Sequence, residues 1–120
     1  MLNQIIGSFK YAFHGLAILI KEEHNYVFHL VAAVLATILG FIYKISSIEW
    51  CLVIFAISFV MVTETLNTSI ENIMDFVSPD RNSSVKRIKD LSAAAVFMSA
   101  LSALTVGLII FIPKMLNTWV

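Results

Sequence analysis

The residues best suited to chemistry form a polar stripe inside an otherwise apolar stretch of the chain. Four of them follow one another at intervals of three, four and four residues: Glu64, Asn67, Glu71 and Asp75. Because this spacing matches the helical repeat, an α-helix places all four on one narrow face. Acidic groups near membrane depth are costly and usually face a protein interior or a watery cavity. The stripe therefore predicts a functional site; the alternative is a solvated helix end just beyond the membrane.

Oxygen-bearing side chains of this kind suit a hard divalent cation. Mg²⁺ is typically held by one or two carboxylates together with substrate phosphates. A lysine such as Lys89 can neutralise a polyphosphate, and a carboxylate beside a hydroxyl can accept its proton during phosphoryl transfer. His14, His24 and His29 show no paired spacing, so we interpret them as structural, and we interpret Cys51 as a small hydrophobic residue. The chemistry that fits is ATP-dependent phosphorylation at a membrane surface.

Nucleotide-binding motifs of soluble proteins are absent from the sequence. It has no G-x-x-x-x-G-K-[ST] stretch and no glycine-rich kinase loop, and it contains only four glycines. A nucleotide site would therefore have to use side chains from helices and from residues 78–90.

The composition is that of an integral membrane protein. The chain has 120 residues, of which 59% are hydrophobic and 13% charged, and the apolar residues come in long blocks. Eight basic residues balance eight acidic ones, which argues against a nucleic-acid partner. Two further apolar blocks follow the first, which begins near Tyr26, so we expect that first block to remain in the mature protein rather than to be cleaved.

These blocks predict an all-α membrane protein forming one domain, with an N-terminal amphipathic surface helix and three transmembrane helices. The predicted helices are residues 1–24, 26–43, 48–67 (continuing as helix to about 77) and 91–112. Pro79 is expected to end the third of these helices, and Pro113 with Lys114 to close the fourth. Trp119 is a candidate interface anchor.

The basic residues predict the orientation of the chain. Six lie on one side of the predicted spans and two, Lys44 and Lys114, on the other, so the N-terminus and residues 78–90 are expected in the cytoplasm. About 20 residues of helix span the bilayer, and counting from Ile48 puts the cytoplasmic interface near Glu64 to Asn67. The acids before the first span and the Lys89–Asp90 pair before the third stand at the same level. Three helices are thus expected to converge there.

At this point the residues resemble a known family. The stretch Glu64-Thr-Leu-Asn-Thr-Ser-Ile-Glu71, then Asp75, then Lys89-Asp90 followed by Ser92-Ala-Ala-Ala, resembles the small prokaryotic diacylglycerol kinases, which include undecaprenol kinases. The resemblance covers almost the whole chain. It implies a homotrimer in the bacterial inner membrane, whose composite active sites, shared between subunits, transfer the γ-phosphate of ATP to a lipid hydroxyl at the cytoplasmic face.

The resemblance also implies a role for each site residue. The implied catalytic residues are Glu64, as general base, and Asn67, which helps hold the reacting groups. The implied ligands of Mg²⁺ are Glu23 and Glu71. The implied nucleotide-binding residues are Tyr11, Glu23, Glu71, Asp75, Lys89 and Asp90. The chain departs from the family pattern at Val27, near which relatives often carry a basic residue, at Met74 and at Ser92-Ala93; His29 in place of an acid favours the undecaprenol kinase branch.

Two other readings of the same residues remain open. The polar stripe could line an ion or proton path in a small channel or transporter subunit, although such a path does not need Lys89, Asp90 and Glu23 at the same depth. A structural or assembly protein would explain the small residues at four-residue intervals in the last span, which are Ala95, Ser99, Ala103 and Gly107. The sequence does not distinguish undecaprenol from diacylglycerol as the acceptor.

Overall fold

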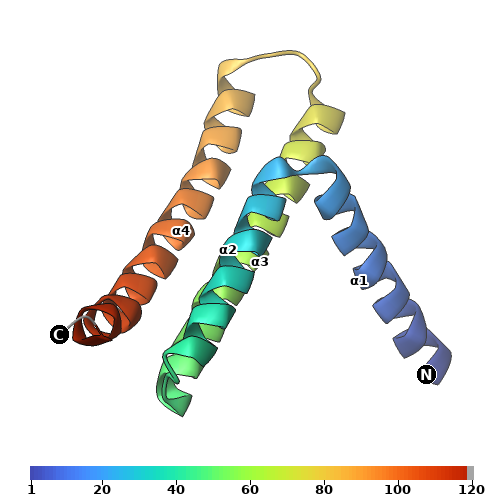
Figure 1. Ribbon diagram of the computed structural model, residues 1–120. Coiled ribbons are helices and arrows are strands. Elements are labelled where there is room, and N and C mark those ends of the chain that lie inside the picture. The colour runs from blue at the N-terminus through green and yellow to red at the C-terminus, as the bar shows by residue number, and fades with distance from the viewer. Residues whose placement is uncertain (119–120) are drawn as a thin grey trace.

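The computed structural model describes residues 1–118 and, within them, contains four α-helices and no strand. The helices are α1 (Leu2–Glu22), α2 (His24–Ile42), α3 (Ser47–Val77) and α4 (Ser83–Thr118) (Figure 1). Three of them, α2, α3 and α4, are long and apolar enough to cross a membrane. Most of their apolar side chains face outward from the chain, as contact with lipid or with further protein requires. The predicted fold class, an all-α membrane protein, is confirmed.

The most extensive contact between helices is that of α3 with α4, which form an antiparallel hairpin (Figure 1). An ion pair joins the two helices near each end: Lys114 Nζ lies 3.2 Å from Glu49 Oε2, and Lys89 Nζ lies 2.5 Å from Asp75 Oδ1. Three of the five buried residues of α4 recur every seven positions, the spacing by which a helix keeps one seam against a partner. They are Val85, Ser92 and Ser99.

Local sequence signals determine where the two hairpin helices begin. Ser46 and Glu49 form a capping box, in which each side chain accepts a hydrogen bond from the other residue's backbone N–H. Asn82 caps α4, because its side-chain oxygen accepts the backbone N–H of Val85 at 2.9 Å. Between the helices, Pro79 prevents α3 from continuing. The ends of the hairpin helices are therefore determined by capping residues and a proline that can be recognised in the sequence.

A close approach at the other end of the molecule packs α2 against α3. A Cβ added to Gly40 would lie 2.6 Å from Cη2 of Trp50, so only glycine leaves room for the indole ring. The ring of Phe41 lies 4.9 Å from that of Trp50. A small hydrophobic core lies at the same end, composed of Ile45, Val53, Ile110 and Phe111. The apolar core and the polar stripe thus occupy different levels of the bundle.

The last helix is longer than predicted at both ends. The sequence suggested a span of 91–112 closed by Pro113, but α4 begins at Ser83 and continues to Thr118 with the proline inside it. The expected stop at Pro113 is wrong because a proline removes one backbone hydrogen bond and bends a helix without having to end it. Figure 1 shows the final turns of α4 bent away from its main axis. Trp119 lies outside the described residues.

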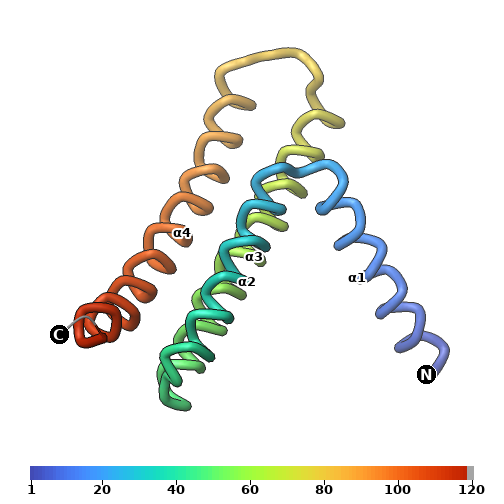
Figure 2. The backbone as a smooth tube through the Cα atoms, viewed as in Figure 1, coloured from blue at the N-terminus to red at the C-terminus, as the bar shows by residue number. Residues whose placement is uncertain are grey.

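The first helix diverges from the other three and is almost entirely exposed (Figure 2). Its single buried residue is Leu19, near the junction with α2. The predicted apolar stripe lies on the exposed side, and its members include Ile5, Phe9 and Phe13. Such a free apolar face is what a helix lying on a lipid surface requires.

Candidate active site

The buried face of α3 changes from apolar to polar partway along the helix. Its buried residues are Val53, Val60, Glu64 and Thr68, which follow one another at intervals of seven, four and four. The first two are ordinary core residues, whereas Glu64 is only 2% exposed and Thr68 only 5% exposed. A carboxylic acid and a hydroxyl therefore occupy positions where the helix pattern calls for hydrophobic side chains.

The predicted stripe of α3 loses burial toward the end of the helix. Glu64 is buried, Asn67 and Glu71 are half-buried, and Asp75 is exposed. Asn67 Nδ2 donates a hydrogen bond to Glu71 Oε1 at 3.3 Å, so these two side chains hold each other one turn beyond Glu64. The arrangement forms a passage of polar groups that starts inside the bundle and ends at its surface.

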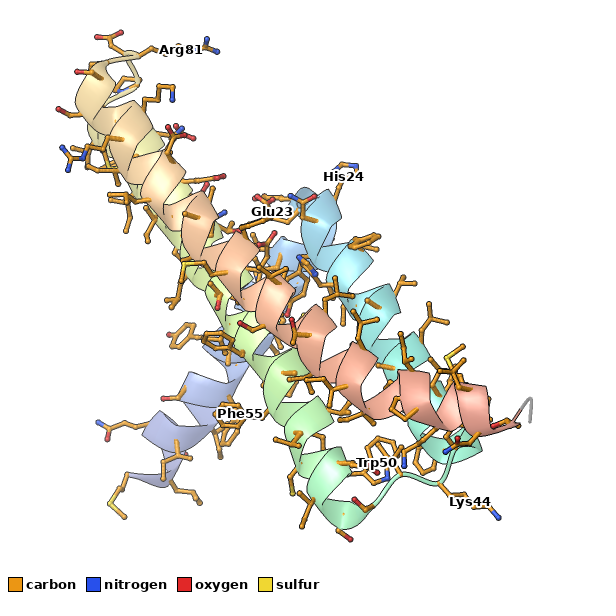
Figure 3. The ribbon with its side chains drawn as sticks, turned by 90° about the vertical axis from the view of Figure 1, so that its left-hand side faces the viewer. Glu23, His24, Lys44, Trp50, Phe55 and Arg81 are labelled. Atoms are coloured by element: carbon orange, nitrogen blue, oxygen red, sulfur yellow. The ribbon has the colours of Figure 1, made fainter. Side chains whose placement is uncertain are left out.

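The junction between α1 and α2 brings further charged groups to Glu64. Glu23, half-buried, is the only residue between the two helices, and its backbone is extended (φ −112°, ψ 103°). Glu23, His29 and Glu71 lie close enough to Glu64 for electrostatic interaction with its carboxyl group. Figure 3 shows Glu23 beside the α3–α4 hairpin, well short of its far end at Arg81. Two predicted metal ligands and the predicted base are therefore in the same part of one chain, although they do not converge on one point.

The predicted nucleotide-binding pair Lys89–Asp90 lies closer to the end of the hairpin, and its two members have different partners. Lys89 contacts Asp75 across the hairpin, whereas Asp90 Oδ2 lies 2.6 Å from Lys86 Nζ on the same helix. Several of these side chains line a shallow hollow of about 510 Å³ at the α3–α4 turn. The lining residues are Arg81, Asn82, Ser83, Val85, Lys86, Lys89 and Asp90. This rim is basic and faces outward.

One predicted residue is not brought to this neighbourhood by a single chain. Tyr11 lies on α1, is 77% exposed, and stands on the helix that diverges from the bundle. Any contact between Tyr11 and the polar stripe would have to come from another copy or from a different position of α1.

The donor groups present suit Mg²⁺ in kind, though one chain does not complete a metal site. Glu23 and Glu71 offer carboxylate oxygens, the ligand type that Mg²⁺ prefers. Over residues 1–118, however, no three histidine, cysteine or acidic side chains converge on one point. Because Mg²⁺ in kinases commonly takes its other ligands from phosphates and water, two carboxylates fit that role.

Three buried oxygen atoms near the start of the stripe lack any hydrogen-bond partner in the described part of the chain. They are Glu64 Oε2, Asn67 Oδ1 and Thr68 Oγ1. Each such atom costs about 1–3 kcal/mol when left unpaired in an apolar interior. Three of them within two helical turns indicate a place built to receive a polar group.

Two of the residues near Glu64 were not predicted from the sequence to belong to the site. Thr68 stands four residues after Glu64, so the same helical spacing could have revealed it, but threonine is common on helices and carries no signal by itself. His29 was interpreted as structural because it lacks a paired ligand nearby in sequence. Its proximity to Glu64 depends on the packing of α2 against α3, which the sequence does not display.

Comparison with known proteins identifies the family of this chain. The model of the prokaryotic diacylglycerol kinase family matches residues 10–111. An undecaprenol kinase from Bacillus subtilis (strain 168) is 35% identical over 95% of this chain and 93% of the relative. A diacylglycerol kinase from Haemophilus influenzae is 31% identical over 82% of this chain and 83% of the relative, and one from Synechocystis sp. is 26% identical over 97% and 67%. The chain therefore belongs to the prokaryotic diacylglycerol kinase family and is a membrane-spanning lipid kinase.

Proposed function

We propose that this lipid kinase transfers the γ-phosphoryl group of ATP to the hydroxyl of a membrane lipid alcohol, undecaprenol or diacylglycerol, at the cytoplasmic face of a bacterial inner membrane. The observation that carries the proposal is Glu64, a fully buried carboxyl group with an unpaired oxygen at the level where the spanning helices become polar. Of the two acceptors, undecaprenol is favoured by the 35% identity with an undecaprenol kinase and by His29.

The reaction needs a base that removes the proton of the acceptor hydroxyl. Glu64 Oε2 takes that proton while the hydroxyl oxygen forms a bond to the γ-phosphorus, and the bond from that phosphorus to the bridging oxygen of ADP breaks. Burial of Glu64 keeps bulk water from competing with the lipid. Asn67, held by its hydrogen bond to Glu71, is placed to orient the reacting groups.

Glu23 and Glu71 would hold Mg²⁺, which, when bound, offsets the negative charge of the ATP phosphates. Lys89, Asp90 and Asp75 would contact the nucleotide from the rim of the hairpin. Tyr11 would then reach the site from another copy, as the homotrimer with shared sites implied by the family resemblance requires.

The distribution of charge supports the cytoplasmic placement. Arg81 and Lys44 lie at opposite ends of the bundle (Figure 3), and the end with Arg81 also carries Lys86, Arg87 and Lys89. The end with Lys44 adds Lys114, whose charge is already paired with Glu49. The excess of positive charge is thus on the side of the polar stripe, as the positive-inside rule requires of a cytoplasmic face.

The test is a phosphoryl-transfer assay with purified protein, γ-labelled ATP and Mg²⁺, in which undecaprenol and diacylglycerol are offered side by side. Label should enter the lipid monophosphate, with undecaprenol the better acceptor. Glu64→Gln should lower turnover by about 10²–10⁴-fold, the usual effect of losing a general base. Glu49→Gln, which alters an acid of the same helix at its opposite end, is the matched control and should stay active. Full turnover by Glu64→Gln would remove Glu64 as the base.

A further inference from the structure

The hydroxyl groups along the polar part of α3 differ in how they are used. Three of them donate to the backbone carbonyl four residues earlier: Thr63 to Phe59, Thr65 to Met61 and Ser69 to Thr65, at 2.5, 2.8 and 2.9 Å. This is the ordinary way in which a helix satisfies such groups within a membrane. Thr68, in the middle of this series, makes no such bond to any described residue.

Thr68 is also the deepest of these hydroxyl residues. It is 5% exposed, whereas Thr65 is half-buried and Ser69 exposed. Its Oγ1 lies on the same helix face as Glu64, one turn away, and both side chains carry an unpaired, buried oxygen. A buried hydroxyl that forgoes an available carbonyl, beside a carboxyl group that also lacks a partner, is positioned for a ligand common to both.

A small side chain faces this position from α4. Glu64 is fifteen residues from Glu49, and Ser99 is fifteen residues from Lys114, so the ion pair between Glu49 and Lys114 puts Glu64 and Ser99 at the same level of the antiparallel hairpin. Ser99 is fully buried and its Oγ donates to the carbonyl of Val96, so it does not compete for the free oxygens. The unpaired groups of α3 are therefore left to an external partner.

We infer that Thr68 binds the acceptor hydroxyl itself, donating a hydrogen bond to its oxygen while Glu64 accepts its proton. This inference rests on the proposed function. An alcohol oxygen has one proton and two lone pairs. The proton passes to Glu64 Oε2, one lone pair forms the bond to the γ-phosphorus as ADP leaves, and the second lone pair accepts the bond from Thr68 Oγ1. The two side chains together fix the direction in which the hydroxyl oxygen attacks.

A hydrogen bond of this kind recognises the hydroxyl group of the acceptor and makes no contact with the rest of the lipid. Undecaprenol and diacylglycerol share a primary hydroxyl but differ in the remainder of the molecule: diacylglycerol has ester carbonyls and undecaprenol has none. Loss of the Thr68 hydroxyl should therefore lower kcat/KM by a similar factor for both acceptors.

The experiment compares three variants with the intact protein, using both lipid alcohols as acceptors at saturating ATP. Thr68→Val keeps the shape of threonine without its hydroxyl and should lower kcat/KM for the lipid by about 10–100-fold, the effect of one hydrogen bond to a buried polar group. Thr68→Ser keeps the hydroxyl and should stay within about threefold of the intact protein. Thr65→Val removes a hydroxyl already bonded to a carbonyl and is the matched control, expected to retain its activity.

Folding is checked for each variant by size-exclusion chromatography and circular dichroism. Should Thr68→Val misfold, Thr68→Ala replaces it, because Thr68→Ala and Thr68→Ser differ only by the hydroxyl. Wild-type kcat/KM in Thr68→Val, equal losses in the serine and valine variants, or a loss confined to diacylglycerol would each overturn the inference. If the intact protein phosphorylates neither alcohol, the proposed function itself fails, and this result is distinct from an active protein that is indifferent to Thr68.

Discussion

Replacing Lys89 by methionine distinguishes a residue that fastens α3 to α4 from one that binds nucleotide. In the structure its Nζ lies 2.5 Å from Asp75 Oδ1, and the two side chains are 34% and 65% exposed. An ion pair this exposed contributes only about 0–1 kcal/mol. A charged contact with a phosphate is worth about 1.5–3 kcal/mol, which corresponds to roughly a 10–150-fold change in affinity. Loss of Lys89 should therefore have a small effect on stability if it only forms the ion pair, and a large effect on ATP affinity if it binds phosphate.

We expect Lys89→Met to raise the KM for ATP at least about tenfold and to change thermal stability by less than about 1 kcal/mol. Kinase activity is measured while ATP is titrated at saturating lipid, and stability is measured as thermal inactivation in the same detergent. Lys114→Met is the control, because Lys114 lies on the same helix and also pairs with an acid of α3, Glu49, but at the opposite end of the hairpin. Its KM for ATP should change by less than about threefold.

A double-mutant cycle with Asp75→Asn completes the test. If Lys89 binds phosphate directly, Lys89→Met retains its high KM for ATP whether or not Asp75 is altered. The reasoning is refuted if Lys89→Met and Asp75→Asn raise the KM equally and the double variant is no worse than either. In that case the lysine would act only through its ion pair.

Three further results are expected. Gly40→Ala should destabilise the protein by about 1–3 kcal/mol, because its Cβ would displace the Trp50 ring; an unchanged thermal inactivation temperature would contradict this. Asn82→Ala should cost about 0.5–2 kcal/mol by removing the cap on the Val85 N–H, measured in the same assay, and Asn82→Asp should restore most of it. Glu71→Ala should raise the Mg²⁺ concentration needed for half-maximal activity by at least about tenfold, and an unchanged magnesium titration would exclude it as a ligand.

Much of the fold is evident from the sequence because apolar blocks and helix signals are local. The break at Pro79 and the number of spans follow from the order of residues alone. The end of α4 was missed for a related reason: Pro113 is a local signal for a stop, yet the helix absorbs it as a bend. The start at Ser83 was missed because its charged first turns lie beyond the apolar block.

The site was less predictable, because burial depends on packing between helices. Spacing put Glu64 and Asp75 on one face of a helix, but the near-complete burial of the first and the exposure of the second depend on how the helices pack around α3. For the same reason the sequence did not display the pairing of Lys89 with Asp75, or the position of Tyr11 away from the bundle. The residue types indicated the chemistry of the site, whereas the burial of each site residue could be learned only from the structure.

The single-residue joint at Glu23 makes the lipid surface part of the geometry of this protein. Because α1 has little contact with the bundle beyond that joint, any tilt of α1 swings the Glu23 carboxylate relative to α3. A bilayer that receives the apolar face of α1 would hold the tilt at one value, whereas a small, strongly curved micelle would hold it at another. We therefore expect bilayer curvature to alter the distance between the Glu23 carboxylate and the acids of α3 without any change of residue.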